Sequence, residues 1–476
     1  MSKKPVLSDG TVLNVKWPTK EVENLGEHID LARVCEHLSG AIQIQTISHV
    51  DENDTDWSKF EEFHAYLRES YPLVHEKLEL TEIGKAGLLY YWKGTDESLD
   101  PIGFLSHQDV VPIEEGTEGD WTHPPFSGYN DGKIIWGRGA LDMKDHLISV
   151  IEAVECLLED GYQPKRGIYL MFGYNEEIVA GDSNAAEKIA KYLEEKGVHL
   201  DSTVDEGGAM IPLNYKPVLN TALAGIGIAE KGYADYKVTV HAKGGHTSAP
   251  PDHTALGKLA KKVVNLEKHQ FPAEMPEYFK DLIKAVAVKC PQPVRFILAN
   301  IDAIEEPVTW ILCKIPAAAS FIRSCMAVTM AEASPAANVQ PQQASVVINF
   351  RMLPGLTMEG VKKYIHKYMG KDVTVELLKG KEASAISPKD SRAFKTLGDV
   401  TLKMHPEAVV TPYMVMGGTD SYHYENVCEN IYRFAPFAVS AGLLLTTHST
   451  NERIPVEQLG NGVAFFKQYM KEMTKE

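Results

Sequence analysis

The sequence predicts an α/β protein with a mostly parallel sheet, into which a ferredoxin-like α+β domain is inserted. Strand-like and helix-like segments alternate through the first half of the chain, whereas a strict alternation of apolar and polar residues begins near residue 234. The length of 476 residues also exceeds what one simple core usually holds, so two domains are expected.

The first domain is predicted from a strand–helix–strand–helix series. Residues 102–105 and 168–172 are short apolar runs, which are typical of buried strands. Residues 146–158 and 185–195 carry apolar side chains at helical spacing. This alternation indicates a largely parallel sheet, and ligands of such sheets gather at the carboxyl ends of the strands.

The inserted domain is predicted from a second series of segments. Residues 234–242 alternate apolar and polar side chains, as in a strand with one face in water. A helix, two strands, a helix and a last strand follow at 255–268, 325–331, 344–352, 358–368 and 373–378. The order βαββαβ is that of a ferredoxin-like unit. The expected domains are therefore a catalytic domain in two parts, 1–225 and 385–476, and an insert at 226–384.

A long stretch at about 271–324 interrupts the inserted domain. It is too long for an ordinary loop. Apolar runs at 296–299, 310–313 and 317–322 predict packed helices that widen the insert.

Composition and charge argue against several classes of partner. The net charge of −17 disfavours binding to nucleic acid or to an anionic membrane. No segment approaches the roughly 20 apolar residues of a spanning helix, and residues 1–5 lead into no apolar run, so no signal peptide is expected. The six cysteines show no CxxC pair, which favours reduced thiols and a cytoplasmic location.

Acids and histidines occur where the apolar strands of the first domain end. His107 and Asp109 follow the strand at 102–105 and share a face, so Asp109 can hold the His107 ring. Glu176 and Glu177 follow the strand at 168–172. Two adjacent carboxylates repel each other there, and either a cation or bulk water would relieve the repulsion.

Three further residues are ambiguous when each is taken alone. Asp142 could be a helix-capping residue, Asp205 a turn acid and His448 a residue of a surface loop. Together with the histidine and acids above, they form the inventory that two metal ions sharing one carboxylate need. One spare acid is left for proton transfer.

The motifs of other enzyme classes are absent from the sequence. It contains no HExxH, no GxSxG and no Walker loop. Gly225-Ile226-Gly227 lacks the third glycine of a dinucleotide-binding fingerprint. A two-metal site therefore has no competing motif.

Short motifs spread over nearly the whole chain carry a family resemblance: SHQDVVP at 106–112, GRGALDMK at 137–144, NEE at 175–177, GGHTSAP at 244–250, GGTDS at 417–421 and HSTNE at 448–452. In content and order they resemble the zinc exopeptidase family of aminoacylase, glutamate carboxypeptidase and succinyl-diaminopimelate desuccinylase. The segments VDEGG at 204–208, EKGY at 230–233 and NIYRF at 430–434 look closest to the carboxypeptidase S branch. That branch includes hydrolases of N-fatty-acyl amino acids.

The resemblance implies ligands for two zinc ions per chain, with Co²⁺ or Mn²⁺ as alternatives. The ligands would be His107 and Asp205 on one ion, Glu177 and His448 on the other, and Asp142 between them. Glu206 is the rival of Asp205, because family members differ in which acid of this loop binds.

The resemblance also implies catalytic and substrate-binding roles. Glu176 would be the general base and then the acid, Asp109 would orient His107, and His246 would stabilise the oxyanion. The substrate would contact Arg351, Asn338, Gly418 and Thr419, with Arg351 and Asn338 gripping its carboxylate. Without the resemblance, the sequence pattern favours an alternative for Arg351, namely a charged side chain on the solvent-exposed face of a strand.

The predicted function is hydrolysis of an amide bond next to a free carboxylate, in a dipeptide or an N-acyl amino acid. Water made acidic by the two ions would give a proton to Glu176, under an inserted domain that closes as a lid. The alternatives are synthesis by the same site, and a metal-dependent binding protein without catalysis, against which the spare acid Glu176 argues.

Three points stay open at the level of sequence. The chain could be a monomer or a homodimer formed through the lid. His246 could act within one chain or across a dimer. The stretch at 271–324 could shape an apolar acyl pocket, or only cover the lid and modify dimerisation.

Overall fold

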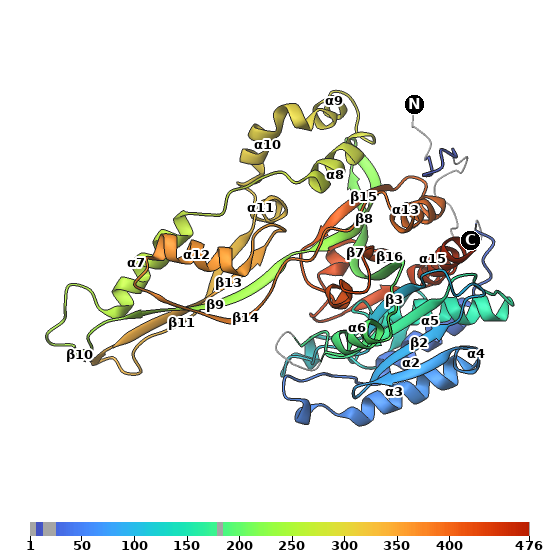
Figure 1. Cartoon of the computed structure of the whole chain (residues 1–476), viewed down its shortest axis with the longest axis horizontal. Coiled ribbons are helices and arrows are strands. Elements are labelled where there is room, and N and C mark those ends of the chain that lie inside the picture. Colours follow the sequence, from blue (N-terminus) through green and yellow to red (C-terminus); the bar gives the residue numbers. More distant parts are fainter. Residues whose placement is uncertain (1–5, 13–24, 179–183, 476) are drawn as a thin grey trace.

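The computed structural model describes residues 6–12, 25–178 and 184–475, which form two bodies. Figure 1 shows the larger body, built on an eight-stranded sheet, beside a four-stranded sheet that extends away from it. Residues 1–5, on which the expected absence of a signal peptide rests, lie outside the described residues.

The eight-stranded sheet has the order β1-β2-β6-β3-β7-β16-β8-β15. Its strands are β1 (Glu79–Ile83), β2 (Gly87–Trp92), β3 (Ile102–His107), β6 (Ile168–Gly173), β7 (Ser202–Tyr215), β8 (Leu219–Glu230), β15 (Val409–Val415) and β16 (Ile431–Ala438). The central strands β6, β3, β7 and β16 are parallel, whereas β1 and β2 join antiparallel. A long antiparallel hairpin of β7 and β8 adds to this, so the sheet is mixed and not mostly parallel as predicted.

Helices cover both faces of the large sheet. Alternate residues of β3 and β6 point to opposite faces, because Phe104 and Leu170 belong to one core cluster and Leu105 and Met171 to another. The helices that pack on the first face include α2 (Leu31–Gln43), α3 (Trp57–Ser70), α4 (Pro72–Lys77), α5 (Lys144–Glu159), α13 (Arg392–Met404) and α15 (Val456–Thr474). Helix α6 (Ala185–Glu195) packs on the second face.

Local sequence signals define both ends of α6. Asn184 caps α6 by accepting hydrogen bonds from two backbone N–H groups of its first turn. Gly197 follows α6 with φ of 69°, a left-handed conformation that glycine adopts without strain. The predicted helices at 146–158 and 185–195 are therefore confirmed.

The four-stranded sheet is antiparallel, with the order β11-β13-β9-β14. Its elements follow one another as β9 (Gly232–His241), α7 (Ala255–Lys268), β11 (Cys325–Glu332), β13 (Gln343–Met352), α12 (Met358–Met369) and β14 (Thr374–Lys381). Apolar residues of α7 and α12 form one core with those of the sheet. The expected boundary at residue 226 falls inside β8, which stays in the large sheet until Glu230.

Two further parts extend the smaller body. A short pair, β10 (Gly245–His246) and β12 (Val339–Gln340), lies at the tip farthest from the large sheet (Figure 1). The stretch predicted to hold packed helices does so, as α8 (Glu277–Ala287), α9 (Val294–Ala299), α10 (Glu305–Leu312) and α11 (Pro316–Ile322).

A three-stranded sheet ties the end of the chain to its first third. It has the order β17-β5-β4, made of β17 (Arg453–Pro455), β5 (Ile134–Trp136) and β4 (Tyr129–Asn130). The pairing of Arg453 with Trp136 places the segment before β17 beside the turn after β5.

The described residues can be compared with the predictions about membrane-spanning helices and cysteines. None of the helices in the described ranges is long and apolar enough to cross a bilayer. Each of the six cysteines is a free thiol.

Candidate metal centre

The carboxyl ends of the parallel strands bring the predicted site residues together. His107 ends β3 and lies in register with Gly173 at the end of β6, so the loop that carries Glu176 and Glu177 starts beside it. Phe104 pairs with Val204 of β7, which places Glu206 at the same edge. The strand topology therefore collects these groups from segments far apart in sequence.

Asp142 lies between two histidines. Its Oδ1 is 3.1 Å from Nε2 of His107, and its Oδ2 is 2.9 Å from Nε2 of His448. Each imidazole has a further carboxylate beside it: Glu206 Oε1 at 3.4 Å from His107 Nε2, and Glu177 Oε2 at 3.0 Å from His448 Nε2. The arrangement has the form of two sites that share one carboxylate.

His107 is oriented by Asp109, but mainly through the main chain. The Nδ1–H of His107 donates to the backbone carbonyl oxygen of Asp109 at 2.9 Å, while Oδ1 of Asp109 is 3.6 Å away. This contact fixes the ring so that Nε2 points at the acids. The Asp109 carboxylate instead accepts a hydrogen bond from the backbone N–H of Glu177 at 3.3 Å.

Glu206, and not Asp205, belongs to the acidic cluster. Ligand atoms of His107, Glu176 and Glu206 lie within 4.8 Å of one another, as do those of His107, Asp142 and Glu177. Asp205 is buried nearby, and its Oδ1 accepts the backbone N–H of Glu206 at 2.9 Å. The geometry therefore favours Glu206, the rival of Asp205, and the predicted ligand role of Asp205 stays a prediction.

The cluster contains more carboxyl groups than its two histidines can keep ionised. Hydrogen bonds to Asp142 and Glu177 raise the pKa of His448 to about 10. Burial raises the pKa of Glu206 to about 8, and the neighbouring Asp142 adds to this rise. Burial, together with nearby acids, also raises the pKa of Glu176 well above its usual value, although His107 opposes the rise. Divalent cations would stabilise these carboxylates in the charged form, so the donor set fits two ions.

Glu452 is a functional residue that sequence reasoning left without a role. Its Oε2 accepts a hydrogen bond from Arg138 at 2.6 Å. Its Oε1 accepts the backbone N–H groups of Gly139, Leu141 and Asp142 at 3.0, 2.9 and 3.2 Å. Glu452 is fully buried and holds the turn that presents Asp142 to both histidines. Its position in the HSTNE motif, four residues after His448, was the feature of the sequence that could have indicated this role.

Replacing Glu452 with glutamine should weaken metal binding by about 10- to 100-fold. The amide keeps one acceptor oxygen for the backbone N–H groups, but it puts an NH2 donor against the Arg138 guanidinium in place of the oxygen that accepts from it. Affinity can be measured by competition with a chromophoric chelator. Glu457→Gln, an exposed change in the first turn of α15, is the matched control. Native affinity in the Glu452 variant would remove it from the positioning role.

The three predicted lid residues do not lie together. His246 and Asn338 are exposed at the tip, where His246 pairs with Val339, and Nδ1 of His246 is 2.9 Å from Oγ of Ser248. Arg351 lies near the other end of β13, with its guanidinium 4.7 Å from the centre of the Tyr233 ring. Gln343 and Arg351 are eight residues apart on one strand, which corresponds to roughly 27 Å.

Thr419 is engaged in a buried network between the two bodies. Its hydroxyl donates to Oε1 of Glu230 at 2.7 Å, and its backbone N–H donates to Oε2 at 3.1 Å. Glu230 also pairs with Arg433 and, at 2.9 Å, with Lys381 of β14. The Thr419 hydroxyl thus donates within the protein, and its predicted contact with the substrate stays a prediction. Gly418 lies beside Lys381, and its predicted role stays a prediction.

The chain is similar to known proteins in both sequence and fold. The model of peptidase family M20/M25/M40 matches residues 103–472. The chain is 34% identical to "Probable carboxypeptidase S-like 2" of Dictyostelium discoideum, over 98% of this chain and 91% of the relative. It is also 34% identical to "N-fatty-acyl-amino acid synthase/hydrolase PM20D1" of Mus musculus, over 92% and 87% of the two chains. Among solved structures, the M20 family metallo-carboxypeptidase Sso-CP2 of Sulfolobus solfataricus superimposes with a TM-score of 0.65 at 18% identity, covering 94% of this chain and 100% of that one.

Proposed function

The chain belongs to peptidase family M20/M25/M40, and from this premise we propose that it cleaves an amide bond beside a free carboxylate, in a dipeptide or an N-acyl amino acid. Membership makes it an enzyme of the metal-dependent hydrolase type, and the resemblance read from its motifs is confirmed. The observation that carries the proposal is the Asp142 carboxylate between two imidazoles, each with a further acid beside it.

Two ions would be held by the residues around Asp142. His107 and Glu206 would hold one, His448 and Glu177 the other, and Asp142 would bridge them. We propose Glu206 in place of Asp205 because Oε1 of Glu206 lies 3.4 Å from Nε2 of His107, whereas Asp205 belongs to neither group of potential ligands among the described residues. When bound, such a pair of ions makes water acidic and polarises the amide carbonyl. Mixed imidazole and carboxylate ligands suit Zn²⁺ and also accept Co²⁺ or Mn²⁺.

Glu176 would carry the proton in this reaction. It shares the cluster with His107 and Glu206 and has no role as a ligand in the proposed scheme. Its carboxylate takes one proton from water as the water oxygen attacks the amide carbon. The same proton then passes to the nitrogen of the leaving amine as the carbon–nitrogen bond breaks.

The substrate carboxylate would be bound from the smaller body. Arg351 lies near the end of β13 that adjoins the large sheet, and a guanidinium binds a carboxylate through two parallel hydrogen bonds. The βαββαβ body would act as a lid that closes over the bound substrate and excludes water. Glu230 and its partners Lys381 and Arg433 lie at the junction of the two bodies, where the chain would bend when the lid closes.

His246 and Asn338 would serve the metal centre of a second copy. Both lie at the tip of the smaller body, away from the metal centre of their own chain (Figure 1). Arg351 and the tip are separated by nearly the length of β13, so they cannot all surround one substrate within a chain. A homodimer in which each tip reaches the partner's cluster resolves this separation.

Removal and return of metal tests the proposed hydrolysis. Chelated protein should lose activity toward dipeptides and N-acyl amino acids, and Zn²⁺ or Co²⁺ should restore it. Amine release measures the rate. The same panel run with high free acid and amine tests synthesis, which the printed name of the mouse relative makes the second candidate. Tight metal binding without turnover in either direction would indicate a binding protein and contradict hydrolysis.

A further inference from the structure

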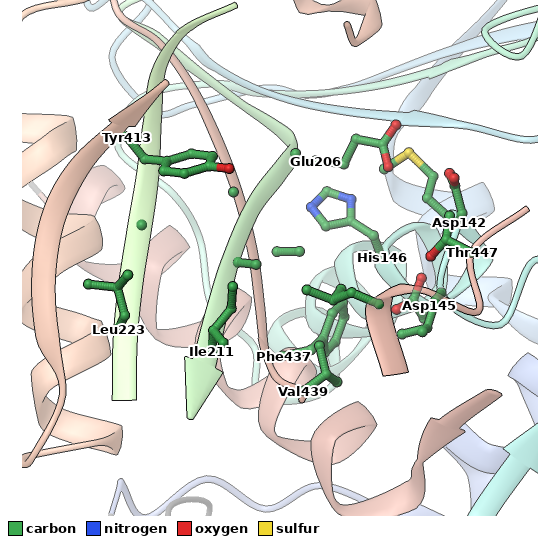
Figure 2. A pocket seen from close by; sticks show the side chains of 18 residues that line it. Asp142, Asp145, His146, Glu206, Ile211, Leu223, Tyr413, Phe437, Val439 and Thr447 are labelled. Atoms are coloured by element: carbon green, nitrogen blue, oxygen red, sulfur yellow. The ribbon is translucent and has the colours of Figure 1, made fainter. Parts of the chain in front are cut away.

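A largely apolar cavity opens beside the acids of the metal centre. Its volume is about 250 Å³, and Asp142 and Glu206 form part of its wall. Figure 2 shows these two acids and Thr447 at one end of the cavity and Leu223, Ile211 and Tyr413 at the other. Phe437 and Val439, at and just after the end of β16, close it from below in that view.

The β7–β8 hairpin builds the far wall of this cavity. Ala209 pairs with Gly225 and Ile211 with Leu223, so alternate residues of both strands face it. Gly225 leaves the space that the Tyr413 side chain needs, because a β-carbon there would lie 3.2 Å from two Tyr413 carbon atoms. The antiparallel hairpin that makes the sheet mixed thus also shapes a space beside the metal centre.

The cavity wall offers no cationic side chain that could pair with a carboxylate. Its wall contains Asp142, Asp145 and Glu206 but no lysine or arginine. His146 faces it with Nε2 unpaired in the described part of the chain, while Nδ1 is 3.0 Å from Oγ of Ser106. Burial lowers the pKa of His146 to about 3, so this ring adds no positive charge at neutral pH. The free carboxylate of a substrate therefore finds its cationic partner outside the cavity, on the side of Arg351.

We propose that this cavity binds the apolar group attached to the acyl carbon of the substrate, and so selects the acyl half of the molecule. The inference rests on the proposed amide hydrolysis and names its acyl specificity. An apolar cavity of about 150 Å³ holds benzene, so this one takes an unbranched acyl chain of about eight to ten carbon atoms. The apolar side chain of an N-terminal residue has the same chemistry and is the second source of such a group. The stretch at 271–324 contributes none of the lining residues, so acyl preference is set in the catalytic body.

A chain-length series with a cavity-filling variant tests this assignment. The metal-loaded enzyme is assayed with one amino acid carrying acyl chains of 2 to 16 carbons, and with dipeptides that begin with Gly, Leu or Phe. In the native enzyme, kcat/KM should rise about fourfold per methylene and stop rising near the length that fills the cavity. Ile211→Phe should flatten this rise, so that the ratio of kcat/KM for medium chains to that for the acetyl substrate falls at least tenfold. Ile211→Ala should move the plateau to longer chains.

A matched control shows whether any change in chain-length preference comes from the cavity itself. Val218→Phe adds a similar apolar group to the exposed turn of the same hairpin, outside the cavity, and should keep the native profile. An unchanged profile in Ile211→Phe, with native thermal stability, would overturn the proposal. Discrimination by Ile211→Phe among dipeptides alone would support it with a peptide side chain as the occupant.

If no substrate is cleaved by the metal-loaded protein, the proposed hydrolysis fails. The cavity is then judged by calorimetric binding of octanoate compared with acetate. Tighter binding of octanoate that is lost in Ile211→Phe supports an apolar site, and equal binding of the two acids overturns it.

Discussion

Replacing Glu176 with glutamine should lower kcat on the order of a thousandfold while both metal ions stay bound. Glutamine keeps the size of the side chain but cannot take a proton from water. The proposed ligands His107, Asp142 and Glu177 remain in place, so the metal content per chain should not change. The measurements are kcat with a saturating substrate and elemental analysis of the purified variant.

Its control is Glu194→Gln, which removes an exposed carboxylate from α6 and should leave both quantities unchanged. A Glu176 variant with near-native kcat would show that another group transfers the proton. Loss of metal together with loss of activity would instead place Glu176 among the ligands. The two results separate proton transfer from metal binding.

The meeting of the site residues could be predicted from local patterns because the strands that carry them are short and parallel. His107 and Glu176 each follow an apolar run, and the parallel register of β3 with β6 then brings them to one edge. The βαββαβ series was likewise readable, because its two central strands, β9 and β13, alternate apolar and polar residues. In both cases the residue pattern within a single segment was enough to predict that segment as a strand.

Features set by pairing between distant segments could not be read in this way. The hairpin of β7 and β8 makes the sheet mixed. The sequence of either strand alone does not show which strand it will pair with. Asp205 and Glu206 are adjacent on a strand, so their side chains point in opposite directions and only the register decides which one meets His107. Glu452 was missed because its function depends on backbone N–H groups of a turn more than 300 residues earlier.

Mixing two inactive variants should restore activity if the tip of one chain serves the partner. His246→Ala should lower kcat about a hundredfold or more, because it removes a group that stabilises the oxyanion. Glu176→Gln is inactive for a different reason, and its His246 is intact. In a mixed dimer, the tip of the Glu176 variant would complete the cluster of the His246 variant. Random exchange of equal amounts would then recover about a quarter of native activity, since half the dimers are mixed and each holds one complete site.

The design distinguishes action across a dimer from action within one chain. Mixing His246→Ala with the double variant Glu176→Gln/His246→Ala should give no recovery, because no chain then supplies the histidine. Mass spectrometry of the native dimer confirms that exchange has occurred. Mixed dimers that form but stay inactive would assign His246 to its own chain. The lid would then have to close far enough to carry β10 from the tip to the cluster around Asp142.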